Sequence, residues 1–136
     1  MPSIRLDETS DIWRASFEGF SDDDVSAPET AEEFAQSVIA TICHASVTAS
    51  VGRRTFERCM RSLSFGSTAR VGFRHPGKAS AVDLVWQQRE QLFHDYTASH
   101  DKLRFLSTLP WIGPVTKHSL ARRLGLEAPE AQRAVA

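Results

Sequence analysis

The stretch that decides the fold is residues 105–125, which read FLSTLPWIGPVTKHSLARRLG. An apolar helical pattern runs into Leu109, and Pro110 ends it because proline lacks a backbone N–H and clashes with the preceding turn. Ile112 is expected to point back between two helices, and Gly113 allows a sharp turn that another molecule can approach closely. The segment therefore predicts two helices joined by a tight turn.

The helix after this turn is predicted to begin at Pro114, since proline is favoured at the first helical position. It is predicted to end near Gly125, a residue suited to a C-terminal cap. The first amides of a helix have no intrahelical partner, and they lie at the positive end of the helix dipole. Both features favour an anion, so the turn is a candidate phosphate site.

Four further helices are predicted upstream from apolar residues at helical spacing. The first begins at Thr30, which forms a capping box with Glu33. The others cover about residues 47–63, 78–93 and 99–108. Alternating apolar residues, the pattern of strands, are not found. We therefore expect an all-α fold, a compact domain of about five or six helices over residues 30–136, preceded by an acidic, weakly ordered segment over residues 1–29.

The charges are divided unevenly along the chain. Residues 1–33 hold ten acidic and two basic residues, whereas residues 34–136 hold seven acidic and fourteen basic ones. The densest basic stretch contains one acid, Glu57, and its basic members are Arg53, Arg54, Arg58, Arg61, Arg70, Arg74 and Lys78. A basic surface of this kind suits a phosphate backbone, although an ordinary solvated helix face has the same composition.

Composition excludes several classes of protein. With 136 residues, 41% of them hydrophobic, the chain is long enough for one globular domain. Its apolar runs are too short to span a membrane, and the N-terminus lacks the apolar stretch of a secretory signal. Two cysteines, Cys43 and Cys59, are too few for a four-thiolate iron–sulfur cluster, and both are expected to be buried. The spacing of the histidines fits no zinc-binding signature. We therefore expect a cytoplasmic protein.

Residues 109–116, LPWIGPVT, resemble the helix-hairpin-helix motif of DNA repair proteins, in which the core usually reads LPGIG. Helix order and spacing over about residues 30–125 resemble the DNA glycosylases of that superfamily, the endonuclease III-like enzymes of base excision repair. Residues 34–46 are similar to their first core helix, and residues 71–83 to a turn that brings up basic side chains. The resemblance implies binding to double-stranded DNA.

Within the family, the turn amides hold one DNA phosphate, often with a monovalent cation on backbone carbonyls. The resemblance places the phosphate at the amides of Gly113, Val115 and Thr116. It places K⁺ or Na⁺ at the carbonyls of Ser107, Leu109 and Ile112. Further candidate DNA contacts are Trp111, which replaces the first family glycine, His44 at the position of a polar wedge, and the basic residues Arg53, Arg54, Lys117, Arg122 and Arg123.

The residues that the family uses for catalysis are replaced here. Its aspartate corresponds to about Arg133, which leaves Glu127 and Glu130 as the candidate carboxylates. Its lysine nucleophile corresponds to Val115, and Lys117 lies about 200° around the helix from that position. Lyase activity is therefore not expected, and the chain resembles a shortened member whose remaining enzymatic option is monofunctional removal of a damaged base.

Two alternative functions stay open from the sequence. The first is a non-catalytic DNA-binding remnant or regulator, which the replaced catalytic residues favour. The second is a protein-interaction module without a DNA role, to which the acidic N-terminal segment would belong. That segment could also act as a DNA mimic that covers the basic body.

Overall fold

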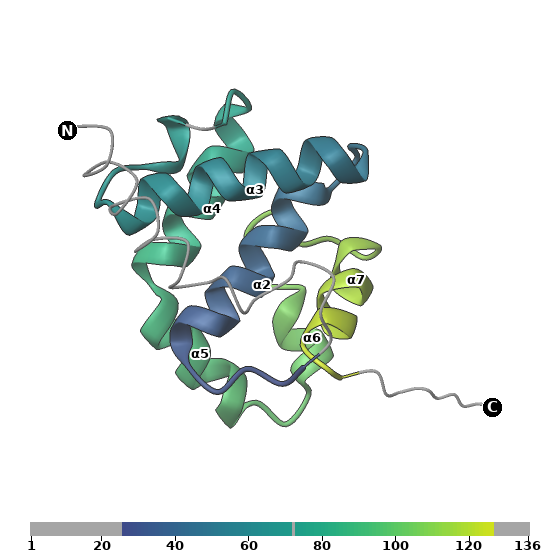
Figure 1. The fold of residues 1–136 in the computed structure, drawn as a ribbon. Helices are drawn as coiled ribbons and strands as arrows, with labels where there is room; N and C mark the ends of the chain where they lie inside the picture. Colours follow the sequence, from purple (N-terminus) through teal and green to yellow (C-terminus); the bar gives the residue numbers. More distant parts are fainter. Residues whose placement is uncertain (1–25, 72, 127–136) are drawn as a thin grey trace.

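The computed structural model describes residues 26–71 and 73–126, and this part of the chain consists of helices and turns (Figure 1). The predicted all-α class is confirmed. The elements in chain order are α2 (Ala31–His44), α3 (Ala49–Ser64), the 3₁₀ turn η1 (Ala69–Val71), α4 (Pro76–Gln87), α5 (Arg89–Ala98), α6 (Lys102–Leu106) and α7 (Thr116–Arg123). Most of the acidic N-terminal segment, with residues 1–25, and the candidate carboxylates Glu127 and Glu130 lie outside the described residues.

Helix α2 runs through the centre of the molecule and contacts α3, α4, α5 and α7 (Figure 1). The predicted start at Thr30 is confirmed, since the Thr30 hydroxyl accepts the Glu33 amide at 3.1 Å. The Glu33 carboxylate accepts the amide of Glu29 at 2.7 Å, one residue before the position of a standard capping box. Because other helices surround it, α2 is buried without interruption from Phe34 to Cys43.

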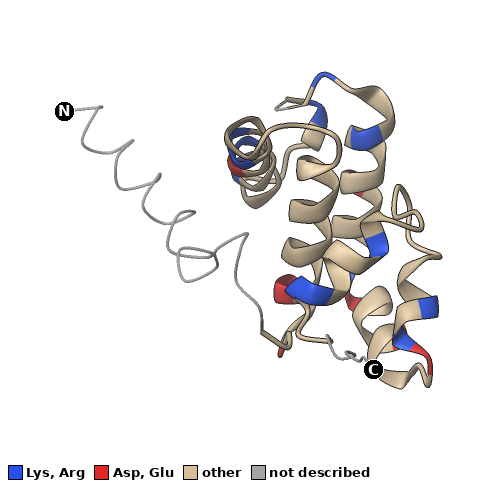
Figure 2. Cartoon of the chain, turned by 90° about the vertical axis from the view of Figure 1, so that its right-hand side faces the viewer, with Lys and Arg blue, Asp and Glu red and all other residues tan. Residues whose placement is uncertain are grey.

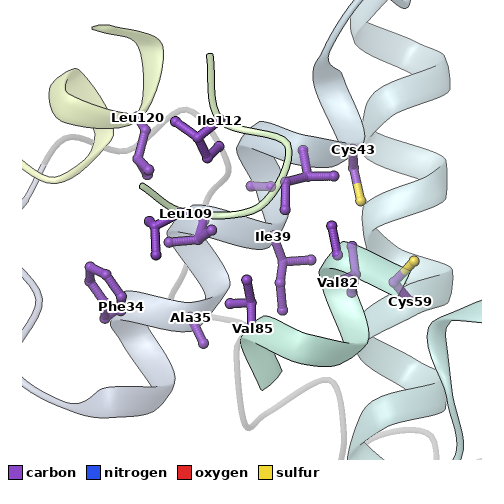
Figure 3. Packing of buried hydrophobic residues seen from close by; sticks show 14 of the residues in the cluster. Phe34, Ala35, Ile39, Cys43, Cys59, Val82, Val85, Leu109, Ile112 and Leu120 are labelled. Carbon is purple, nitrogen blue, oxygen red and sulfur yellow. The ribbon is translucent and has the colours of Figure 1, made fainter. Parts of the chain in front are cut away.

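The core forms where apolar side chains of the other helices meet α2. Ile112 from the turn and Leu120 from α7 lie at one end of the cluster, and Leu109 lies between them and Phe34 (Figure 3). Val82 and Val85 approach Ile39 from α4. Ile112 is 5% exposed, so the prediction that its side chain points between the helices is confirmed. The hairpin is therefore anchored to the core by its own apolar residues.

The prediction of one continuous helix over residues 78–93 is wrong. The pattern over residues 78–93 belongs to two helices, α4 and α5, with a break at Gln88, whose backbone lies at φ −104° and ψ 19°. Arg89 stabilises this break, because its guanidinium donates to the Trp86 carbonyl at 2.7 Å and lies over the Trp86 ring at 4.1 Å. Neither glycine nor proline marks the break in the sequence, so periodicity alone does not reveal it.

The remaining helix boundaries shift by a few residues. Helix α6 is shorter than predicted because Asp101 caps it, with the carboxylate accepting the Arg104 amide at 3.1 Å. Helix α7 begins at Thr116 rather than Pro114, which lies in the preceding turn. The predicted role of Gly125 is confirmed, since it has φ +75° and lies within a Schellman cap closed by the Leu126 amide on the Ala121 carbonyl at 2.9 Å.

Candidate nucleic-acid interface

The turn between α6 and α7 is built by short backbone bonds and two buried side chains. The Leu109 amide donates to the Leu106 carbonyl at 3.1 Å, and the Ile112 amide donates to the Leu109 carbonyl at 3.2 Å. Leu109 and Ile112 are both buried, so the chain enters and leaves the turn from fixed points on the core. We call residues 102–126, from the start of α6 to the cap of α7, the α6–α7 hairpin.

Beyond Ile112, the hairpin presents backbone donors at its surface. The amides of Gly113, Val115 and Thr116 donate to no carbonyl within the described residues, whereas the next amide, that of Lys117, donates to the Gly113 carbonyl at 2.9 Å. Val115 caps α7 without a side-chain hydrogen bond and is 81% exposed. These are the three amides that the sequence places on a phosphate, and here they lie together at an exposed helix start.

Gly113 leaves room in front of these amides. A Cβ atom built on it would meet no other atom within 4 Å, and its φ lies outside the range in which side chains are strained. The position therefore tolerates a side chain in the free protein. A bulky side chain there would occupy the space through which an anion approaches.

Trp111 has a left-handed backbone conformation, with φ +66°. Such a conformation costs a residue with a side chain about 1–2 kcal/mol and is ordinarily filled by glycine, the residue that the resembled motif has at this place. The ring makes an edge contact with His75, with the centroids 5.0 Å apart, and its six-membered part faces Gly77. The side chain remains 44% exposed, so part of it is open to a ligand.

The loop between α2 and α3 contacts the first turn of α4, which is also the turn that contacts Trp111. Lys78 is buried, and its ammonium donates to the Ala45 carbonyl at 2.6 Å. Lys78 is therefore not part of an exposed basic stretch, which corrects the sequence prediction. In this loop Ser46 is exposed and adopts φ +64°, the other left-handed residue besides Trp111 that is not glycine in the described residues.

His44 does not extend toward a ligand as the wedge position implies. Its ring lies so close to Gly52 that a Cβ atom built there would be 2.3 Å from the His44 Nδ1 atom. The ring is therefore folded against the first turns of α3 and is half-buried. Ser46, two residues further on, is the exposed polar side chain at this point of the loop.

Helix α3 carries the main basic surface. Arg53, Arg54, Arg58 and Arg61 are all exposed, and the acid among them, Glu57, pairs with Arg53 at 3.3 Å. Figure 2 shows how basic and acidic positions are distributed along the helices. Arg54, Arg58 and Arg61 add three further positive charges on the same helix. We call these four arginines the α3 basic surface.

The basic residues of α7 differ in environment. Arg122 is exposed and Lys117 is half-buried, so both remain candidates for a phosphate. Arg123 instead donates to the Thr41 hydroxyl of α2 at 3.0 Å and ties the end of α7 to the central helix. This bond gives Arg123 a structural role that the sequence did not predict, and the phosphate contact stays a prediction.

Cys43 and Asp83 have structural surroundings, in the core and beside η1 respectively. A hydrogen bond with Cys59 that favours the protonated thiol, together with burial, raises the pKa of Cys43 far above its usual range, so Cys43 stays protonated and is a poor nucleophile. Both cysteines are buried as predicted (Figure 3). Asp83 accepts the Ala69 amide at 2.6 Å and thereby orders η1.

Cation binding depends on backbone carbonyls. The Leu109 carbonyl already accepts one amide and retains a second lone pair, and the Ser107 and Ile112 carbonyls accept no backbone amide in the described part of the chain. These oxygens therefore have lone pairs that no backbone amide of the described residues occupies. Over residues 26–71 and 73–126, no three His, Cys, Asp or Glu side chains come close enough to hold a metal ion, and none of the helices there is long and apolar enough to cross a membrane.

The sequence prediction missed the first turn of α4. His75 caps this helix, with Nδ1 accepting the Lys78 amide at 3.2 Å, and Gly77 faces Trp111. Pro76 at the first helical position, preceded by a residue that can accept a hydrogen bond, is the signal that places the helix start here rather than at Lys78. The contact with Trp111, more than thirty residues away, has no local signal.

Comparison of the chain with protein families, with curated proteins and with solved structures finds no match.

Proposed function

We propose that the protein binds double-stranded DNA through the α6–α7 hairpin, with one backbone phosphate held by the amides of Gly113, Val115 and Thr116. The observation that carries this proposal is that three neighbouring amides at the start of α7 donate to no carbonyl in the described residues, with Val115 exposed and Gly113 and Thr116 half-buried. A phosphate oxygen accepts hydrogen bonds from such amides and is favoured by the helix dipole.

The α3 basic surface supplies the charge for this interaction. Arginine pairs with phosphate over a short range and releases counterions from DNA, which favours binding to any sequence. The first turn of α4 connects the loop before α3 to the hairpin, through Lys78 and Gly77 respectively. This turn of α4 therefore lies between the hairpin and the loop that leads into α3.

The proposal covers binding to the DNA backbone rather than base chemistry. The resemblance to base-excision-repair glycosylases motivates a search for base removal, for which Glu127 and Glu130 are the candidate carboxylates. Incubation with duplexes that carry single uracil, alkylated or oxidised bases tests this activity. Release of any base assigns the protein to the monofunctional glycosylases, and no release in the presence of tight binding assigns it to the non-catalytic DNA-binding proteins.

The binding itself is tested by replacing Gly113. We expect Gly113→Val to weaken binding to a labelled plain duplex at least tenfold in fluorescence anisotropy, because the side chain blocks the approach to the amides. Thr97→Val, on the exposed surface of α5, is the matched control and should bind like the original chain. Both variants should keep the helix content of the original in circular dichroism. Normal binding by a folded Gly113→Val variant would contradict the proposal.

A further inference from the structure

We infer that Trp111 is a positioning residue of the hairpin, whose ring, held against Gly77 of α4, orients the amides of Gly113, Val115 and Thr116 for a shared ligand. The consequence for DNA affinity rests on the proposed function. The orientation of the amides is a property of the free protein and is tested without DNA.

The ring and the first turn of α4 fit one another closely. A Cβ atom built on Gly77 would lie 2.8 Å from Cζ3 and 3.2 Å from Cη2 of Trp111. These two atoms belong to the six-membered part of the indole, so the space at Gly77 is the space that the large ring needs. Alanine is a better helix former than glycine, so helix formation does not account for glycine at this place.

His75 completes the contact. Its ring meets the Trp111 ring at 79°, an edge-on geometry favoured by the charge distribution of aromatic rings. His75 is itself held in place, because its Nδ1 atom accepts the Lys78 amide and caps α4. The indole is therefore bounded by a fixed backbone at Gly77 and a fixed ring at His75.

Two neighbouring side chains then fix the turn to different elements. Ile112 is buried in the core that surrounds α2, and Trp111 contacts α4. Gly113 follows Ile112 directly in the chain. The contacts of Trp111 and Ile112 therefore both restrain the peptide bond that leads to the three amides. A left-handed Trp111 held in this way is the kind of strained residue that folded proteins keep where a binding group must be oriented.

The test is a double-mutant cycle on the full chain, with Gly77→Ala, Trp111→Phe and the two combined. Residual dipolar couplings in NMR report the direction of the Val115 and Thr116 N–H bonds in the free protein. We expect Gly77→Ala to change these couplings, because the new methyl group displaces the indole. We expect the double variant to restore them, because phenylalanine lacks the outer part of the indole that meets the methyl group. Ser80→Ala, exposed on the same helix, is the control and should change nothing.

Binding to a plain duplex provides the second readout. Gly77→Ala should weaken the affinity about tenfold, and Trp111→Phe should restore most of the loss. If the couplings change and recover while no variant, including the original chain, binds DNA, the inference holds and the proposed function fails. If Gly77→Ala leaves both couplings unchanged, or if Trp111→Phe fails to restore them, the inference is wrong.

One further variant keeps the test decisive if Gly77→Ala does not fold. Trp111→Ala removes the ring without introducing a clash. It should reorient the same two N–H bonds, and unchanged couplings in this variant would overturn the inference.

Discussion

Trp111 combines a backbone conformation that favours glycine with a side chain that the neighbouring helix accommodates. The positive φ destabilises the residue, and the contacts with Gly77 and His75 offset this cost. The two effects can be separated by substitution, because glycine removes both the strain and the ring, whereas alanine removes only the ring.

We therefore predict that Trp111→Gly is more stable than Trp111→Ala by about 1 kcal/mol, the cost of holding a Cβ atom at positive φ. Urea denaturation of the two variants measures the difference directly. Both should be less stable than the original chain, since both lose the aromatic contacts. An alanine variant as stable as the glycine variant would show that the turn does not hold residue 111 in the left-handed region.

The sequence supplied most of the information about the hairpin at the level of single residues. Ile112 was predicted to point between the helices and Gly125 to cap a helix, because each prediction depends on local pattern or local backbone geometry. The contacts of His44, Lys78 and Arg123 could not be predicted, because each depends on a partner outside its own segment. A charged side chain in a basic stretch gives no sign that a distant carbonyl or hydroxyl will bind it.

Among the elements, the contact between α2 and α5 depends on aromatic packing. Tyr96 of α5 lies 4.9 Å from Phe34 of α2 between ring centroids, and it is 4% exposed. Burial raises the pKa of the Tyr96 hydroxyl from 10.0 to about 12, because the tyrosinate form loses solvation.

This shift predicts a loss of stability at alkaline pH. Below pH 10 the tyrosine is protonated in both the folded and the unfolded chain. Between about pH 10 and 12 the unfolded chain releases the proton while the folded chain retains it, so the free energy of unfolding falls by about 2–3 kcal/mol as the pH rises. Tyr96→Phe should lose less stability over this interval than the original chain, as measured by urea denaturation at several pH values. Equal losses in the two proteins would contradict the assignment of the shift to Tyr96.

Helix existence was easier to predict than helix limits. The start of α2 was predicted correctly because Thr30 and Glu33 provide a local cap. The break between α4 and α5 was missed because Gln88 has no conformational restriction, and the break is stabilised by the contacts of Arg89 with Trp86. Pro114 was compatible with the first helical position, yet it belongs to the turn, where a fixed φ is equally suitable.

At the scale of the whole molecule, α4 brings together elements that are distant in sequence. Its first turn contacts the hairpin at Trp111 and the loop after α2 at Ala45, and that loop leads into the α3 basic surface. This arrangement could not be predicted from spacing, because it depends on how the helices pack around α2. The first turn of α4 therefore contacts both the hairpin, which carries the neutral amides, and the loop that leads to the charged arginines of α3.

Under the proposed function, these two parts contribute to DNA binding in different ways. Amides hold a phosphate without carrying a net charge, whereas each arginine that neutralises a phosphate releases counterions. Loss of an arginine contact should therefore change the salt dependence of the affinity. Loss of the amide contact should lower the affinity at every salt concentration.

The most direct test of DNA binding by the hairpin and the α3 basic surface is fluorescence anisotropy on one plain labelled duplex over a salt series. The proteins to compare are the original chain, Gly113→Val and the double variant Arg54→Gln/Arg58→Gln. We predict that the logarithm of the association constant falls linearly with the logarithm of the salt concentration. The arginine variant should lower the magnitude of the slope by up to about 2, since each phosphate contact contributes about 0.9. Gly113→Val should weaken binding with a nearly unchanged slope. Absence of binding at low salt, or equal affinities and slopes for all three proteins, would contradict the account.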